Sequence, residues 1–398
     1  MSTLLTKVGR LWSAGEPAAE AVDVLLADGL IQALGPTGSL IPSDEPEVYD
    51  CGGALLTAGL IDAHTHPLYL RPRLAEVAAR ARGSTYAEIA AQGGGIGATV
   101  RDTRGASWAE LEMGLKSRLR GWLLGGSTTV EAKTGYWLTR EGELGAVELL
   151  HRLSEQPRLP HLVVTLLGAH ALPPEFAGRR GEFVEEVAGW AGAARRHGAR
   201  FADAFCDQGA FTLGESERLL GSARAAGLGL RLHADELALT GGTRLAVRLG
   251  ATSADHLLQI GEAEIAVLAG SSTVATLCPV TALSMGRRPP AREMLAAGVS
   301  LALGSDHNPG TSGATTMALI VWLAINELGL SVEQALTAAT LGGARSLALA
   351  DRGQVAPGLL GDLVLWDAEH EGTFAWNPAT APRQVWRQGR GVLEASPG

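Results

Sequence analysis

The chain has few cysteines, few lysines and no excess of positive charge. Its three cysteines, Cys51, Cys206 and Cys278, are far apart, which excludes a CxxC motif and argues against a disulfide framework. We expect buried free thiols. The formal net charge is -9 at pH 7, and only three of the 33 basic residues are lysines. With its basic residues scattered, the chain offers no cationic surface for phosphates, so a nucleic-acid partner is not expected.

Long apolar runs are also missing. No stretch reaches the roughly 18 uncharged apolar residues of a membrane span, and residues 1–15 lack the apolar core of a signal peptide. We therefore expect a cytoplasmic protein without a membrane partner. The 398 residues are 46% hydrophobic and 19% charged, which is enough to bury a large core. This composition predicts one large domain with an appendage.

Short β-rich runs alternate with helical patterns along most of the chain. One helical segment, 107–124, opens with a capping box of Ser107 and Glu110, and another, 182–198, ends on a glycine. The runs lie at 56–66, 127–135, 161–172, 200–209, 229–237, 250–260, 272–280 and 299–310. Eight such units predict a parallel sheet closed into a (β/α)8 TIM barrel, an α/β fold, over 58–352.

The two termini have a different pattern of short alternating strands and turns. Neither 1–57 nor 353–398 is long enough to fold alone. We expect them to form one small β-sandwich domain together.

Polar residues gather where the predicted barrel strands end, which is the active-site rim of such barrels. His64 and His66 follow the first run, and on spacing alone they are as well explained as two capping histidines. Later runs end in His233, in His256 and in Asp306. Three histidines and one carboxylate at one rim suit Zn(II) or Fe(II) and leave a position for water.

Several stretches resemble the metal-dependent amidohydrolases and, within them, the imidazolonepropionases of histidine breakdown. They are "GLIDAHTH", "TTVEAKTGY", "GAHALPPEF", "DAFCDQGAF", "LHADELALTGG", "GATSADHL", "LGSDHNPGT" and the region around "GGGI". The HxH pair and a late aspartate would indicate only the superfamily. The combination of "GGGI", "KTGY" and "DHNPGT" is much more specific.

The resemblance implies hydrolysis of a cyclic amide on a small substrate with a carboxylate arm, one divalent metal ion per chain, Zn(II) or Fe(II), and a homodimer. It implies metal ligands at His64, His66, His233 and Asp306, and catalytic roles for Asp306, His256 and Glu236. It implies substrate contacts at Arg73, Tyr86, Tyr136, His170, Glu236, Asn308, Gly310 and Thr311.

These roles agree with the chemistry of the residues. Asp306 can accept a proton from water, while His256 and Glu236 orient the water or stabilise the oxyanion. Either Asp306 or Glu236 could protonate the leaving nitrogen. Arg73, with help from tyrosine hydroxyls, could hold the carboxylate arm. Without the family pattern, Arg73 would be better explained as a solvated loop charge.

Three further features have competing explanations. Lys133 could be a carbamylated lysine between two metals, but we favour a structural ion pair and a single metal. The glycines of "QGGGIGATV" lack a GK[ST] ending, so we expect them to allow close backbone approach and not phosphate binding. His307 should point away from the site and have a structural role.

The chain departs from the family pattern after His66, in "PLYLRPRLAEV", and at Trp137, where glycine is usual. Both departures concern the shape of the pocket near the carboxylate arm. Two other functions stay open. One is another mononuclear amidohydrolase, such as a cyclic-amide hydrolase or an aminoimidazole or purine deaminase. The other is a binding protein without activity.

Overall fold

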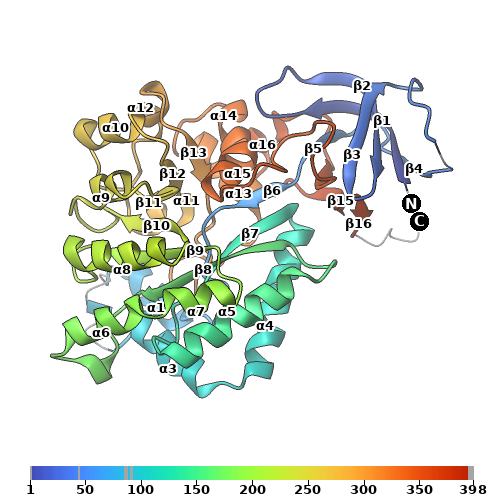
Figure 1. The fold of residues 1–398 in the computed structure, drawn as a ribbon. Helices are drawn as coiled ribbons and strands as arrows, with labels where there is room; N and C mark the ends of the chain where they lie inside the picture. The colour runs from blue at the N-terminus through green and yellow to red at the C-terminus, as the bar shows by residue number, and fades with distance from the viewer. Residues whose placement is uncertain (1, 44, 85–87, 90–92, 393–398) are drawn as a thin grey trace.

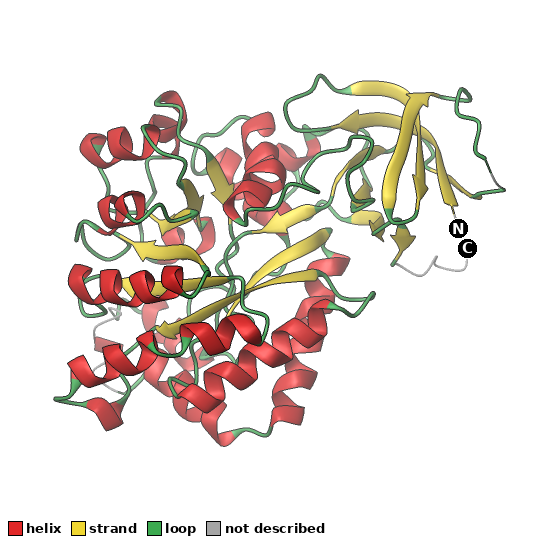
Figure 2. Cartoon of the chain, viewed as in Figure 1, coloured by secondary structure: helices red, strands yellow, loops and turns green. Residues whose placement is uncertain are grey.

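The computed structural model describes residues 2–43, 45–84, 88–89 and 93–392, and its strands form two separate sheets. Helices flank the strands of the larger unit, and the smaller unit is mostly strand (Figures 1 and 2). The larger sheet contains β6 (Leu60–Asp62), β7 (Ser127–Lys133), β8 (His161–Ala169), β9 (Phe201–Cys206), β10 (Gly229–Ala234), β11 (Ser253–His256), β12 (Val274–Leu277) and β13 (Leu301–Leu303).

The larger sheet is the predicted barrel. Its strands pair in chain order from β6 to β13, and every pairing is parallel. The ring closes just past the ends of β6 and β13, where Ala63 N donates to Leu303 O (3.1 Å) and His66 N donates to His307 O (2.8 Å). Nearly every residue of these strands is buried, as expected for a parallel sheet covered by helices. The α/β barrel prediction is confirmed.

Helices cover the outside of the barrel and form its connections. The α-helices are α1 (Leu74–Ala81), α3 (Ile96–Gly105), α4 (Trp108–Leu124), α5 (Arg140–Ser154), α6 (Arg180–Ala188), α7 (Ala191–Arg196), α8 (Leu213–Ala225), α9 (Gly242–Arg248), α10 (Glu262–Ala269), α11 (Pro279–Ser284), α12 (Ala291–Ala296), α13 (Met317–Asn326), α14 (Val332–Thr337), α15 (Gly343–Ser346) and α16 (Thr373–Trp376). A 3-10 turn, η1 (Pro174–Phe176), and a π-helical turn, η2 (Ala338–Gly342), complete the set among the described residues.

Two helix predictions had different outcomes. The capping box of α4 is confirmed, because the Ser107 hydroxyl accepts from Glu110 N and the Glu110 carboxylate accepts from Ser107 N. The segment 182–198 is not one helix. It is divided into α6 and α7, because Gly189 caps α6 and the chain starts a new helix after Trp190.

The smaller unit is built from both ends of the chain, as predicted, and the strands of the expected β-sandwich belong to one hydrogen-bonded sheet. It contains β1 (Ser2–Trp12), β2 (Ala19–Ala27), β3 (Leu30–Pro36), β4 (Glu47–Asp50), β5 (Leu55–Ala58), β14 (Leu363–Trp366), β15 (Pro382–Arg387) and β16 (Arg390–Gly391). β5 joins the two ends by pairing with β1 on one side and β14 on the other. The smaller sheet has a hydrophobic core separate from the main core of the barrel, and this core includes Leu5, Val24 and Trp386. The predicted run 56–66 is therefore two strands, β5 in this sheet and β6 in the barrel.

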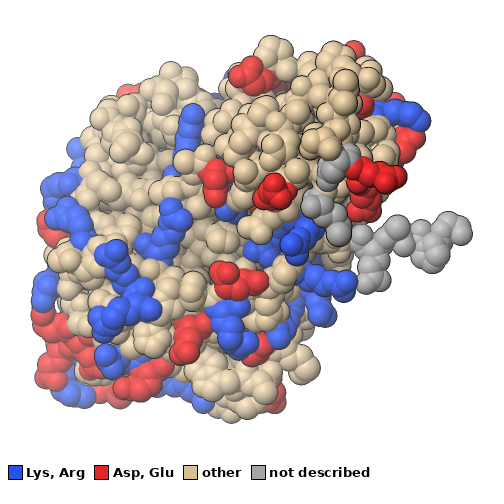
Figure 3. All heavy atoms as spheres, turned by 45° about the vertical axis from the view of Figure 1, so that its right-hand side comes forward, with Lys and Arg blue, Asp and Glu red and all other residues tan. Residues whose placement is uncertain are grey.

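The surface charge, the helix lengths and the cysteines can be compared with the sequence predictions. Both signs of charge are interspersed over the face drawn in Figure 3. Among the described residues, no helix has the length and apolar character needed to cross a bilayer. All three cysteines are buried and unpaired, as predicted.

Candidate active site

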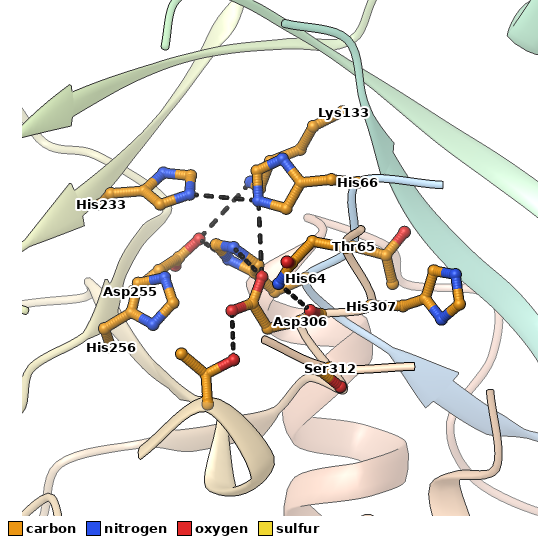
Figure 4. Close-up of polar contacts among 12 residues, drawn as sticks. His64, Thr65, His66, Lys133, His233, Asp255, His256, Asp306, His307 and Ser312 are labelled. Atoms are coloured by element: carbon orange, nitrogen blue, oxygen red, sulfur yellow. Dashed lines mark hydrogen bonds and ion pairs between the residues drawn. The ribbon is translucent and has the colours of Figure 1, made fainter. Parts of the chain in front are cut away.

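Five polar side chains converge at the rim where the barrel strands end (Figure 4). His64 and His66 follow β6, His233 belongs to β10, His256 ends β11, and Asp306 follows β13. Two of these residues have left-handed backbone, with φ of 75° at His256 and 46° at Asp306. Such conformations cost energy in residues other than glycine and are concentrated at functional sites.

The imidazoles and the carboxylate form one compact donor set. His66 Nε2 lies 3.3 Å from His233 Nε2, and Asp306 Oδ1 lies 3.5 Å from His66 Nε2 and 3.7 Å from His64 Nε2. Ligand atoms of the three histidines all lie within 4.8 Å of one another. His64 Nε2 is buried and has no hydrogen-bond partner among the described residues. A buried, unsatisfied imidazole nitrogen facing other donors fits a site for a divalent metal ion.

Backbone packing brings His64 into this set. Gly304 follows β13 beside His64, and a Cβ on this glycine would lie only 2.6 Å from the Cβ of His64. A larger residue would therefore push the two strand ends apart. The two ends are joined further on, where Asp306 N donates to His64 O at 2.9 Å.

Carboxylates hold the outer nitrogens of two of the histidines. His64 Nδ1 lies 2.7 Å from Asp255 Oδ2, and His233 Nδ1 lies 2.9 Å from Asp203 Oδ2. Such contacts fix the tautomer and the ring orientation of metal-binding histidines. Burial lowers the pKa of His64 well below its usual value, so the imidazole is neutral, as metal binding requires.

These carboxylates belong to a fully buried ion cluster below the site. Lys133 Nζ lies 2.8 Å from Glu131 Oε1 and 2.7 Å from Asp203 Oδ2, and Arg231 Nη2 lies 3.1 Å from Asp255 Oδ2. Burial alone would raise the pKa of Asp203. The nearby His233 and Lys133 lower it by more than burial raises it, so the pKa of Asp203 lies below its usual value. The predicted ion pair of Lys133 is confirmed.

His256 and Glu236 lie beside the donor set and line the same pocket. His256 Nδ1 is 3.7 Å from Glu236 Oε1. Burial lowers the pKa of His256 to about 3 and raises the pKa of Glu236 well above its usual value. Burial also raises the pKa of Asp306 to about 6, against the hydrogen bond from Thr281. The site therefore contains an imidazole with a lowered pKa beside two carboxyl groups with raised pKa values, a combination typical of acid–base sites.

A pocket lies above the donor set. Most of the sequence-predicted residues line it: His66, Arg73, Tyr136, His170, His233, Glu236, His256, Asp306, Asn308 and Thr311. His64 lies beneath the pocket, fully buried. Tyr86 lies outside the described residues.

Arg73 is a lining residue, whereas its neighbour Arg71 is not. Arg73 Nε donates to Glu76 Oε2 at 2.8 Å, and Nη1 donates to the Thr99 hydroxyl. The guanidinium packs over Gly310, where a Cβ would meet Nη2 at 1.9 Å. Gly310 thus lies against Arg73 and not on the pocket wall. Arg71 is exposed and pairs with Asp102 on the surface.

Aromatic side chains form the part of the pocket wall next to His66. The His66 ring stacks on His170 with centroids 5.0 Å apart, and Tyr136 lies 5.2 Å from His170. His170 Nδ1 lies 3.0 Å from Gly135 O, so the ring is tied to the loop that carries Tyr136. Trp137 points elsewhere and stacks on Trp108 at 4.8 Å.

The structure also separates one histidine from the site, as predicted. His307 points away from the donor set (Figure 4), with Nε2 2.8 Å from the Tyr69 hydroxyl and Nδ1 3.1 Å from Ala314 O. The glycines of the "GGGI" segment precede α3, whose first residue, Ile96, lines the pocket.

Sequence reasoning missed several residues around the site. Asp203 and Thr281 contact proposed metal ligands, while Phe205 and Met285 line the pocket. The missed signal for Asp203 was an acidic residue inside the apolar strand "FADAFC", where a charge needs a buried partner. Thr281 had no such signal.

Comparison with known proteins first defines the class. Residues 206–392 match the model of the amidohydrolase family. The fold is similar to an adenosine deaminase from Xanthomonas campestris with bound zinc, with a TM-score of 0.74, 22% identity, and coverage of 98% of this chain and 92% of that chain. It is also similar to a 5-methylcytosine deaminase from Klebsiella pneumoniae, with a TM-score of 0.76, 15% identity, and coverage of 99% and 97%. The barrel fold is shared with these structures, and residues 206–392 match the amidohydrolase family.

Closer relatives define the family. The chain is 40% identical over 363 residues to an imidazolonepropionase from Cereibacter sphaeroides, covering 90% of this chain and 91% of the relative. It is 42% identical over 349 residues to one from Symbiobacterium thermophilum, covering 85% and 82%. It is 40% identical over 377 residues to one from Pseudomonas paraeruginosa, covering 93% of both. The chain belongs to the imidazolonepropionase family.

Proposed function

We propose that this protein hydrolyses the cyclic amide of 4-imidazolone-5-propanoate to N-formimidoyl-L-glutamate, in histidine degradation. The observation that supports this most is that one pocket is lined by His66, His233 and Asp306 of the donor set and also by Arg73 and Tyr136. The donors fit a metal that acts on the ring, and the arginine fits the propionate. We also propose one Zn(II) or Fe(II) ion per chain, a homodimer and a cytoplasmic location.

The donor set would be His64, His66, His233 and Asp306. A divalent ion bound there supplies Lewis-acid polarisation of the ring carbonyl and lowers the pKa of water from 15.7 to about 7. The carboxylates of Asp203 and Asp255 keep two of the imidazoles in the orientation that ligation needs.

The reaction adds water to the ring carbonyl carbon and breaks the bond from that carbon to the ring nitrogen. Asp306 accepts a proton from the attacking water. His256, neutral because burial lowers its pKa, donates an N–H hydrogen bond to the developing oxyanion. The leaving nitrogen takes its proton from Asp306 or Glu236, and the water oxygen ends in the new carboxylate.

The remaining residues orient the substrate. Arg73, together with Tyr136 and Tyr86, binds the propionate, and His170, Asn308 and Thr311 contact the ring. Because this pairing of a cation with a carboxylate lies away from the broken bond, it positions the ring over the donor set.

The test is direct turnover of imidazolonepropionate by the purified protein, with the product identified by mass spectrometry. We expect turnover that a strong chelator abolishes and added Zn(II) or Fe(II) restores, while circular dichroism shows that the fold remains. Aminoimidazole and purine substrates serve as the comparison. Ammonia release from these, without turnover of imidazolonepropionate, would favour the deaminase alternative.

A further inference from the structure

Thr281 is a buried threonine that no sequence pattern predicted to be functional and that does not line the pocket. It lies in α11, the helix that follows β12 at the active-site rim, and its side chain is 1% exposed. Its hydroxyl donates to Asp306 Oδ2 at 2.5 Å. The other oxygen, Oδ1, faces the Nε2 atoms of His64 and His66. The two oxygens of Asp306 therefore have different partners.

The Thr281 hydroxyl is also the middle of a chain of hydrogen bonds. Its oxygen lies 3.2 Å from the Thr311 hydroxyl, which accepts from Asn308 Nδ2 at 2.7 Å. The same amide nitrogen donates to the backbone oxygen of Asp306, also at 2.7 Å. The chain of hydrogen bonds thus starts at Asn308 and Thr311, which line the pocket, and ends at the carboxylate of Asp306.

Counting protons fixes the direction of this chain. The amide nitrogen of Asn308 can only donate, and an ionised carboxylate can only accept. Thr311 therefore accepts a hydrogen bond from Asn308 and donates one to Thr281. Thr281 in turn donates a hydrogen bond to Asp306. Each hydroxyl then donates once and accepts once, and Asp306 Oδ2 is the last acceptor.

We propose that Thr281 is a positioning residue that holds Asp306 by Oδ2, directs Oδ1 at the imidazole nitrogens, and couples this orientation to Asn308 and Thr311. Without the hydroxyl, the carboxylate can rotate about its terminal torsion, which has broad and shallow preferences. The donor set then loses its fixed geometry although none of its members is removed. As a hypothesis about catalysis, this inference rests on the proposed function, but its effect on metal binding does not.

The test compares Thr281→Val, which keeps the shape and removes the hydroxyl, with Thr281→Ser, which keeps the hydroxyl. Zn(II) affinity of the metal-free protein is measured by competition with a chromophoric chelator, and kcat and KM are measured on imidazolonepropionate. Thr281→Ala replaces the valine variant if that one does not fold. The matched control is Thr273→Val, because Thr273 is equally buried but its hydroxyl donates to Ala251 O before β12, at the opposite end of the strand.

We expect Thr281→Val to weaken Zn(II) affinity about 10- to 100-fold, the range found when groups that orient ligands are removed. We expect a similar loss in kcat with KM changed less than about threefold, because the substrate contacts remain. Thr281→Ser should be within about threefold of wild type in both measurements, and Thr273→Val should change neither.

Two results would overturn the inference. Wild-type Zn(II) affinity and kcat in Thr281→Val would mean that the hydroxyl is dispensable. Equal impairment in the serine and valine variants would mean that packing of the methyl group, and not the hydroxyl, explains the residue. If the wild-type protein does not turn over imidazolonepropionate, the proposed function fails, while the Zn(II) titration still decides the role of Thr281.

Discussion

Replacing Arg73 with methionine removes the one arginine or lysine among the described residues that line the pocket, and with it the group that would bind the carboxylate arm by charge. The Arg73 side chain is 9% exposed and lines the pocket. Nε and Nη1 bond to Glu76 and Thr99, while Nη2 has no hydrogen-bond partner among the described residues. Nη2 is therefore the guanidinium nitrogen that we expect to donate to a carboxylate. Arg73→Met keeps a long side chain but removes the charge, the Nη2 donor and the hydrogen bonds to Glu76 and Thr99.

The size of the effect follows from the strength of such contacts. Hydrogen bonds between charged groups contribute about 1.5–3 kcal/mol. At about 1.4 kcal/mol per factor of ten, this predicts a KM on imidazolonepropionate raised about 10- to 150-fold. The contact lies away from the bond that breaks, so it stabilises substrate and transition state alike, and kcat should change little.

The assay needs two controls, because Arg73→Met also leaves Glu76 without its partner. The first is Arg71→Met, whose exposed ion pair with Asp102 contributes little, so that KM should stay within about twofold of wild type. The second is an imidazolone without the carboxylate arm, on which both variants should equal wild type. Equal losses on the two substrates, or a larger effect at Arg71, would refute the assignment of Arg73.

The remaining predictions concern the site and the core. His256→Ala should lower kcat at least about 100-fold with unchanged metal content by elemental analysis, because it removes an oxyanion donor and no ligand. Asp203→Asn should weaken Zn(II) affinity about 10- to 100-fold in a chelator competition, with Thr273→Val as control. Lys133→Met should lower the free energy of unfolding by about 3–5 kcal/mol, because it leaves buried carboxylates without a cation, and an unchanged Tm would contradict this. Burial lowers the pKa of His161 to about 3. The unfolded chain therefore binds the extra proton first, and stability is lost as pH falls from about 6.5 towards 3. In His161→Gln the drop in Tm between pH 8 and pH 5 should be smaller than in wild type, and an equal drop would exclude this contribution.

Much of the barrel could be predicted from the sequence because its strands are short, apolar and regularly spaced. Every predicted run contains a barrel strand, and the polar residues at the run ends lie at one rim. The exact first and last residues of the strands and helices could not be predicted. The run 56–66 reads as continuous because β5 and β6 are both fully buried, although they belong to different sheets. The helical pattern of 182–198 likewise continues across the break at Gly189, since apolar periodicity does not show where a helix is interrupted.

The sequence by itself determined which residues can do the chemistry. Three histidines and an aspartate lie at or just after strand ends, an arginine lies in the loop after the first barrel strand, and local chain direction is enough to place strand ends on one rim. Only the tertiary structure decided how these groups are held. Strand register sets His233 beside Asp255 and brings its Nδ1 to Asp203, and the packing of α11 on the rim brings Thr281 to Asp306, 25 residues away along the chain. Such contacts depend on distances of a few tenths of an ångström between separate elements, and no local pattern in the sequence specifies them.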